Sequence, residues 1–211
     1  MKQFDLSLYL VLDPDLCRVI GMVETARLAV LGGATMVQLR DKQATTAEMI
    51  ATGLQLKAAL SGAGVSLIVN DDVEAALAIG ADGIHVGQED MNATAVRKRV
   101  GDRLILGLSV ETEDLARRVD PAVVDYVGVG PVLATGTKPD HKQPVGFEGL
   151  ARIVAASPIP AVAIGGVKFE HVEEIFRAGA KGLAVVSAIC GSPDPQGATR
   201  LIADKMAEVK K

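Results

Sequence analysis

The strongest constraint on the fold is a strand–helix unit that recurs along the chain. Three helix-to-strand joints have nearly the same sequence: Gly32–Thr35 (Gly-Gly-Ala-Thr), Gly80–Gly83 (Gly-Ala-Asp-Gly) and Gly179–Gly182 (Gly-Ala-Lys-Gly). Glycine readily takes the left-handed conformation that ends many helices. Each joint therefore predicts a helix before it and a strand after it.

Apolar runs and amphipathic segments predict eight strands that alternate strictly with eight helices. The strands are expected at residues 8–12, 36–40, 65–69, 83–86, 104–109, 126–129, 161–164 and 182–186. The helices are expected at residues 23–31, 47–60, 73–79, 92–100, 112–119, 147–156, 170–178 and 197–209. Such alternation in a chain of 211 residues predicts a single-domain (β/α)8 TIM barrel over residues 1–211, an α/β fold.

A doubly wound open sheet is the competing fold. That fold needs a glycine fingerprint after the first strand, and Asp13-Pro14-Asp15 stands there instead. No linker or shift in composition marks a second domain. The closed barrel is therefore the preferred interpretation.

Charge and composition limit the kinds of partner. The chain has 22 basic and 26 acidic residues and no basic run, so we expect neither nucleic acid nor membrane as a partner. The first residues precede no long apolar run, so we expect no signal peptide and no membrane span. Cys17 and Cys190 fit no metal spacing and are expected to be buried thiols in a reducing cytoplasm. The sequence leaves open whether the protein forms a homodimer.

Polar side chains follow the predicted strands at their C-terminal ends, where the active site of such a barrel lies. The second strand carries Gln38, Arg40 and Lys42 on one face, because strand side chains alternate. An amide, a guanidinium and an ammonium in line can bind a multiply charged anion such as a phosphate. Taken alone, the three residues favour a solvated strand face, and only the surrounding barrel with polar residues at its strand ends argues for an anion site.

Two acidic residues lie at the ends of adjacent strands, Asp71 after the third and Asp90 after the fourth. Mg²⁺ prefers oxygen ligands and usually binds one or two carboxylates together with substrate phosphates. Asp71 could instead cap a helix, although Asp72 is the better cap, and Asp90 could be a solvated acid. Beside Arg40 and Lys42, the two acids indicate a magnesium–pyrophosphate site.

A second phosphate site is expected after the seventh and eighth strands, where many such barrels bind phosphate. Gly165 and Gly166 allow close approach of the backbone, and amide groups near Ser187 can face an anion at a helix N-terminus. A plain turn is the alternative for the two glycines.

The segment Gly130–Gly146 is long for a strand-to-helix connection and indicates a functional loop or lid. It carries Thr135, Thr137 and Lys138, but its glycines match neither a dinucleotide fingerprint nor a P-loop. Phosphate binding is favoured over a Schiff base for Lys138, because nothing in the sequence argues for its desolvation.

Two ring side chains give weaker signals. His85 shares strand parity with neighbouring glycines, and a buried core histidine is as consistent with this as a substrate contact. Tyr9 is expected to face the barrel interior, where packing is the better interpretation than contact with a flat substrate.

Seven stretches resemble the thiamine-phosphate synthase family, and they follow the family's order across nearly the whole chain. They are Tyr9–Val11, Val37–Lys42, Val69–Asp72, Gly80–Asp90, Gly128–Lys138, Ala163–Val167 and Val185–Ile189. The resemblance implies a Mg²⁺-dependent transferase that couples hydroxymethylpyrimidine pyrophosphate to a thiazole phosphate with loss of pyrophosphate. Gly136 and the charged segment Pro139–Pro144 depart from the family pattern and leave the geometry of the lid open.

The resemblance also implies a role for each candidate residue. Those implied to hold the pyrimidine pyrophosphate are Gln38, Arg40, Lys42, Asn70 and Lys138, with Ser109 nearby and Asp71 and Asp90 as Mg²⁺ ligands. Those implied to surround the thiazole phosphate are Thr135, Thr137, Gly165, Val186 and Ser187. Lys138, Arg40 and Ser109 are the residues expected to act in catalysis. The family mechanism is thought to be dissociative, which needs charge stabilisation on the leaving pyrophosphate rather than a strong base.

Two other functions stay open. A thiazole tautomerase is a related barrel that needs no pyrophosphate site, so it would leave Arg40, Lys42, Asp71 and Asp90 idle. A non-catalytic sensor of thiamine precursors would keep a phosphate pocket but tolerate loss of a metal ligand, and here both acids remain.

Overall fold

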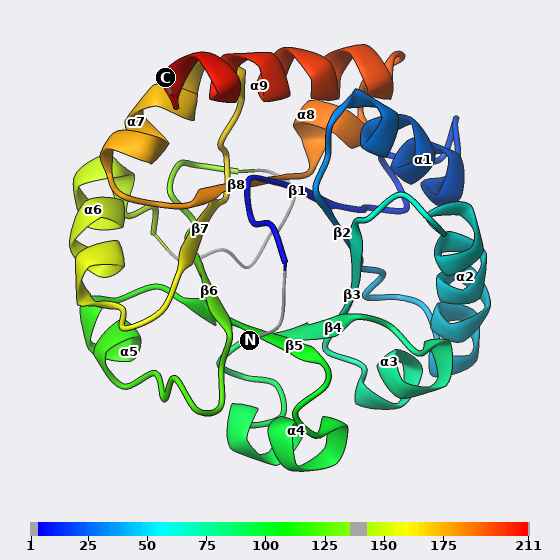
Figure 1. The fold of residues 1–211 in the computed structure, drawn as a ribbon, viewed down its shortest axis with the longest axis horizontal. Coiled ribbons are helices and arrows are strands. Elements are labelled where there is room, and N and C mark those ends of the chain that lie inside the picture. The colour runs from blue at the N-terminus through cyan, green and yellow to red at the C-terminus, as the bar shows by residue number, and fades with distance from the viewer. Residues whose placement is uncertain (1–3, 136–142, 211) are drawn as a thin grey trace.

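A computed structural model of the chain, described for residues 4–135 and 143–210, contains a closed barrel of parallel strands (Figure 1). Neighbours in the ring follow chain order, and β1 pairs with β8 to close it. The strands are β1 (Leu8–Val11), β2 (Met36–Leu39), β3 (Ser66–Asn70), β4 (Gly83–Val86), β5 (Ile105–Val110), β6 (Tyr126–Val129), β7 (Ala161–Ile164) and β8 (Gly182–Val185). The predicted TIM barrel is confirmed, and the open sheet is excluded.

Helices cover the outside of the ring (Figure 1). They are α1 (Met22–Gly32), α2 (Thr46–Ala59), α3 (Val73–Ile79), α4 (Ala93–Val100), α5 (Glu113–Arg117), α6 (Gly146–Ala156), the 3-10 turn η1 (Phe169–His171), α7 (Val172–Arg177), α8 (Ser187–Cys190) and α9 (Pro195–Val209). The short helix α8 is absent from the predicted set, because a single turn has no detectable periodicity. Among the described helices, none is long and apolar enough to cross a membrane.

Side chains at the helix ends decide which acidic residues are available for other roles. Thr45 caps α2 through a capping box with Glu48, whose carboxylate accepts from the Thr45 amide at 2.8 Å. Asp72 caps α3, because its side chain accepts from the Ala75 amide at 2.8 Å. The preference for Asp72 as the N-cap is confirmed, and it leaves the Asp71 carboxylate available for another role.

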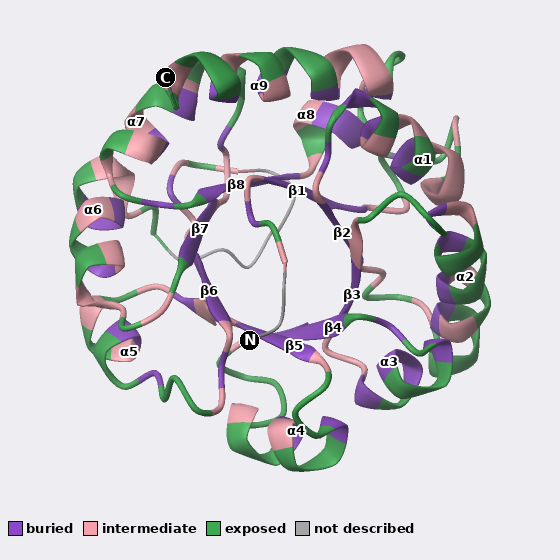
Figure 2. Ribbon diagram, in the orientation of Figure 1, coloured by how far each residue is buried: buried purple, intermediate pink, exposed green. Residues whose placement is uncertain are grey.

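Apolar side chains fill two separate layers. One lies between the strands and the helices, and Figure 2 shows the strands and the inner faces of the helices as buried. The other fills the interior of the barrel. Its buried members are Leu6, Tyr9, Val11, Met36, Ile68, Ile105, Tyr126, Val162 and Ala184. Because alternate residues of each strand point inward, the next inward positions of these strands reach the rim.

The two cysteines are free and buried, as predicted. The Cys190 thiol on α8 donates to the Val11 carbonyl of β1 at 3.6 Å. A hydrogen bond with Cys190 is the main reason that the pKa of the Cys17 thiol is lowered to about 7. The pair therefore packs α8 against the segment that follows β1.

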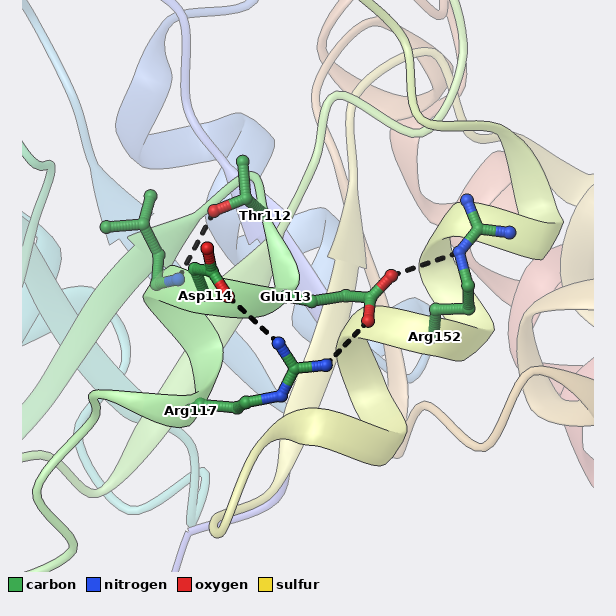
Figure 3. Close-up of polar contacts among 6 residues, drawn as sticks. Thr112, Glu113, Asp114, Arg117 and Arg152 are labelled. Atoms are coloured by element: carbon green, nitrogen blue, oxygen red, sulfur yellow. Dashed lines mark hydrogen bonds and ion pairs between the residues drawn. The ribbon is translucent and has the colours of Figure 1, made fainter.

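A cluster of exposed ion pairs on α5 reaches α6 through one pair (Figure 3). Glu113 accepts from Arg117 at 2.8 Å and from Arg152 of α6 at 3.1 Å. Asp114 also accepts from Arg117, at 2.9 Å. Exposed pairs of this kind contribute little to stability. The buried apolar side chains beneath them therefore supply most of the stabilisation of these two helices.

Candidate functional site

The ends of β2 and β3 meet in an ion pair between Lys42 and Asp71. Asn70 Nδ2 donates to the same carboxylate oxygen, Asp71 Oδ2, at 2.6 Å. Asp71 has a φ of 61°, a left-handed conformation that residues other than glycine seldom adopt. Its amide donates to the His85 carbonyl of β4 at 2.9 Å, which holds the conformation in place. Backbone outliers of this kind gather at functional sites.

The surroundings of Asp71 disfavour its ionised form. Burial is the largest cause of its raised pKa, a hydrogen bond with Asp90 is the second, and Lys42 acts in the opposite direction. Asp90 also accepts from the Gly87 amide at 2.7 Å. Two carboxyl groups close enough to share a proton are also close enough to share a cation.

The two carboxylates fit Mg²⁺ as part of a larger ligand set. Within residues 4–135 and 143–210, no group of three or more His, Cys, Asp or Glu side chains could enclose a metal ion. Mg²⁺ commonly takes one or two carboxylates and completes its shell with water and substrate phosphates. Asp71 already accepts one cation, the Lys42 ammonium. The donor set therefore fits an ion that binds together with a phosphorylated substrate.

Arg40 adds a second cation to this side of the rim. It follows β2 directly, two residues before Lys42, and its side chain is half-buried. It forms no ion pair with any carboxylate in the described part of the chain. A half-buried guanidinium with no carboxylate partner among the described residues can bind an anionic ligand through two oxygens at once.

A chain of hydrogen bonds crosses the barrel interior. Gln38 Nε2 donates to the Tyr9 hydroxyl at 2.6 Å, and that hydroxyl lies 2.9 Å from the hydroxyl of Tyr126. The Tyr126 hydroxyl lies 3.0 Å from His85 Nδ1, and His85 Nε2 lies 2.9 Å from Ser109 Oγ. The five residues come from five strands. The chain joins Gln38 to Ser109, two residues that the sequence predicts to bind substrate.

Tyr126 is a member of this chain that the sequence analysis does not select. Its position at the start of β6 has the same parity as Gly128, and this parity is the signal that could have placed it in the interior. Burial raises the pKa of both tyrosines, so both phenols keep their protons. Tyr9 faces the interior as predicted, and it hydrogen-bonds there as well as packing.

Backbone turns shape the rim after β7 and β8. Gly165 and Gly166 have φ values of 93° and 67°. A Cβ on Gly166 would lie 2.5 Å from the Ala134 carbonyl oxygen, so no side chain fits there. Val186 is the N-cap of α8 and Ser187 its first residue. The first amides of a helix have no partner within it, so this part of the rim is rich in backbone donors.

The loop after β6 contributes one described candidate, Thr135, which is half-buried. Thr137 and Lys138 lie outside the described residues, so their predicted roles rest on the sequence. The remaining candidates fall into two groups. One group lies at or after the ends of β2 to β5, and the other follows β7 and β8.

Comparisons with known proteins agree on one family. A family model described as thiamine monophosphate synthase matches residues 8–189. The chain is 43% identical over 200 residues to a thiamine-phosphate synthase of Psychrobacter sp. (strain PRwf-1), with 93% of each chain covered. It is 46% identical over 201 residues to that of Xanthobacter autotrophicus (strain ATCC BAA-1158 / Py2), with 95% of each covered. The solved structure of thiamine phosphate pyrophosphorylase from Pyrococcus furiosus matches with a TM-score of 0.88 at 35% identity and covers 98% of both chains.

Proposed function

This chain belongs to the thiamine-phosphate synthase family of transferases, and we propose that its barrel rim condenses hydroxymethylpyrimidine pyrophosphate with a thiazole phosphate, giving thiamine phosphate and pyrophosphate. The observation that carries the proposal is the ion pair of Lys42 with Asp71 beside Arg40. This group combines cations for phosphate oxygens with a carboxylate for a metal ion. Such mixed charge suits a metal–pyrophosphate complex better than either ion alone.

The charge on the leaving group is the main electrostatic demand of this reaction. Bound Mg²⁺ would supply positive charge that stabilises the departing pyrophosphate. We assign Asp71 and Asp90 as its ligands, because their carboxyl groups interact and Asp71 already pairs with one cation. Arg40 offers a planar fork to two oxygens and Lys42 a point charge. These groups favour departure of pyrophosphate before the thiazole nitrogen attacks, a step that needs no strong base.

The polar groups next to this cluster are assigned to the pyrimidine pyrophosphate. Asn70 binds the Asp71 carboxylate, and Gln38 and Ser109 end the buried hydrogen-bond chain. Held side chains orient a substrate at a lower entropic cost than mobile ones. Lys138 is assigned to the same substrate from the family resemblance.

The thiazole phosphate is assigned to the turn Gly165–Gly166 and to Val186 and Ser187 at the start of α8. A glycine turn and a helix start both present backbone N–H groups to an anion. Thr135 is assigned here from its place in the loop that packs on this turn, where the Leu133 amide donates to the Gly165 carbonyl at 2.9 Å. Thr137 joins it from the family resemblance.

The proposed reaction is tested by measuring pyrophosphate release from the purified protein. Release should require both substrates and Mg²⁺, stop with EDTA, and return when Mg²⁺ is added in excess. Reactions with one substrate omitted are the controls. Release from the pyrimidine substrate alone at the full rate would contradict the coupling, and activity that survives EDTA would contradict the metal assignment.

The two alternatives give different results in the same assay. A thiazole tautomerase would convert its thiazole phosphate without the pyrimidine substrate, and a sensor would bind both precursors without releasing pyrophosphate. The ion pair of Lys42 with Asp71 speaks against the tautomerase, which needs no pyrophosphate site. A sensor would tolerate loss of a metal ligand, and here both Asp71 and Asp90 are present. A cytoplasmic location is also part of the proposal, because Cys17 and Cys190 are both free thiols.

A further inference from the structure

The hydrogen-bond chain from Gln38 to Ser109 lies in the interior of the barrel. Tyr9 and Tyr126 are 1% and 0% exposed, Gln38 is 3% exposed, and His85 is 9% exposed. In the described part of the chain, the Tyr9 hydroxyl has two polar partners, Gln38 and Tyr126, and the Tyr126 hydroxyl has two, Tyr9 and His85. The hydrogen of each hydroxyl must therefore go to one of these partners in the hydrogen-bond chain.

The amide at one end sets the direction of every bond. Gln38 presents Nε2 to Tyr9, and an amide nitrogen can only donate. The Tyr9 hydrogen then goes to Tyr126, and the Tyr126 hydrogen goes to His85 Nδ1. Since Nδ1 accepts, the neutral imidazole carries its hydrogen on Nε2 and donates it to Ser109 Oγ.

Two glycines make room for this arrangement. A Cβ on Gly107 would lie 2.2 Å from Tyr126 Cζ and 2.4 Å from His85 Nδ1. A Cβ on Gly128 would lie 3.2 Å from His85 Cε1. The rings of Tyr126 and His85 lie with centroids 5.5 Å apart in the space that these glycines leave. The packing around the chain is therefore specific to the two rings.

We propose that this hydrogen-bond chain holds the Ser109 hydroxyl as a hydrogen-bond donor toward the substrate. Tyr9, Tyr126 and His85 are then positioning residues. Ser109 Oγ accepts from His85 Nε2, so its own hydrogen is directed away from the interior and toward the rim. A donor there suits an acceptor such as a pyrophosphate oxygen or a ring nitrogen. The role in turnover rests on the proposed function, whereas the direction of the chain does not.

The direction can be measured without substrate from the tautomer of His85. Nuclear magnetic resonance of the full chain with isotope-labelled histidine nitrogens distinguishes hydrogen on Nε2 from hydrogen on Nδ1, and a His85→Asn variant identifies the signal. We expect the neutral tautomer with hydrogen on Nε2. Hydrogen on Nδ1 would reverse every bond, turn the Ser109 hydroxyl inward and overturn the proposal, whether or not the protein turns over its substrates.

The effect on turnover is tested with Tyr126→Phe and Ser109→Ala, singly and together. Tyr126→Phe removes the two hydrogen bonds of the Tyr126 hydroxyl and keeps the ring, so kcat should fall about tenfold. If Tyr126 acts through Ser109, adding Tyr126→Phe to Ser109→Ala should change kcat little further. Independent, multiplying losses would contradict a positioning role.

Two further variants keep this test decisive. Thr199→Val is the control, because it removes another buried hydroxyl, one that donates to the Pro195 carbonyl at 2.6 Å in α9. It should lower the melting temperature without changing kcat. Tyr9→Phe breaks the chain one step earlier and replaces Tyr126→Phe if that variant does not fold. If Tyr9→Phe kept both the His85 tautomer and the full kcat, the hydrogen-bond chain would not control the direction of the Ser109 hydroxyl, and the proposal would be contradicted.

Discussion

Lys42 and Asp71 are 29 positions apart in sequence, yet their side chains form an ion pair where β2 and β3 end. Asp71 is the only described residue other than glycine with a positive φ. Its carboxyl group also interacts with Asp90 after β4. Three neighbouring strands thus contribute charge to one point on the rim, and this point is where variants should separate activity from stability.

Asp71→Asn should abolish pyrophosphate release and raise the melting temperature of the metal-free protein at neutral pH. The raised pKa means that folding disfavours the ionised carboxylate, so the wild type loses stability as the pH rises through that pKa. The gain in the variant should therefore shrink as the pH falls through that raised pKa and be gone below the ordinary range of aspartate. Thermal melts across this range measure it.

Asp72→Asn is the matched control, because asparagine also caps a helix and α3 should keep its N-terminus. Its melting temperature should change little and its activity should persist. A lower melting temperature for Asp71→Asn at neutral pH would show that the pair with Lys42 outweighs the cost of burial.

Arg40→Lys should weaken binding of the pyrimidine pyrophosphate about tenfold while the fold is unchanged. The ammonium keeps the charge but loses the planar fork that binds two oxygens, a difference of about 1.4 kcal/mol. Calorimetric titration measures it. Arg27→Lys on the exposed face of α1, where Arg27 pairs with Glu24 at 2.6 Å, should leave the affinity unchanged. Equal affinity in Arg40→Lys would remove this contact from the site.

Gly166→Ala should raise the KM for the thiazole phosphate at least about tenfold. A Cβ there would lie 2.5 Å from the Ala134 carbonyl oxygen, so the loop after β6 must move. Steady-state kinetics with the thiazole phosphate varied measures the change.

Gly62→Ala is the control that separates the steric clash at Gly166 from the backbone strain of an alanine with positive φ. Gly62 has a φ of 77°, and a Cβ there would meet nothing within 4 Å. Both substitutions put alanine in the left-handed region, at about 1 kcal/mol each. Only Gly166→Ala should change the KM, and the same loss of thiazole phosphate binding in both variants would point to global destabilisation instead.

Glu113→Gln should lower the free energy of unfolding by only on the order of 0.5 kcal/mol, because its pairs with Arg117 and Arg152 are exposed (Figure 3). Denaturant unfolding at low and high salt measures the loss, which should vanish at high salt. Turnover should be unchanged. A loss of several kcal/mol would mean that the pair of Glu113 with Arg152 holds α5 and α6 together.

The parts of this fold that sequence predicts are those that depend on local patterns. The joints at Gly32, Gly80 and Gly179 mark helix ends, and Gly33, Gly80 and Gly179 have the positive φ values expected there. The bounds of β4, β6 and β7 match the prediction. Each of these elements is specified by residues next to one another in the chain.

The parts that the sequence did not predict depend on contacts between distant residues. Tyr126 gains its role from Tyr9 and His85, which are 117 and 41 positions away. The Lys42–Asp71 pair needs the register of β2 and β3, where Leu39 aligns with Val69. The predicted strand ends placed the cations and the acids on one rim, but they do not give the pairing, because the pairing depends on the register of neighbouring strands.

The closing contact of the ring, where Tyr9 of β1 aligns with Ala184 of β8, also sets when the site forms during synthesis. A chain still on the ribosome and lacking β8 has two open strand edges, on β1 and on β7. The proposed thiazole phosphate site depends on Ser187, near the end of the chain, whereas Arg40 of the proposed pyrophosphate site is made early. Catalytic competence is therefore expected to arrive late and all at once, rather than in proportion to the length of chain translated.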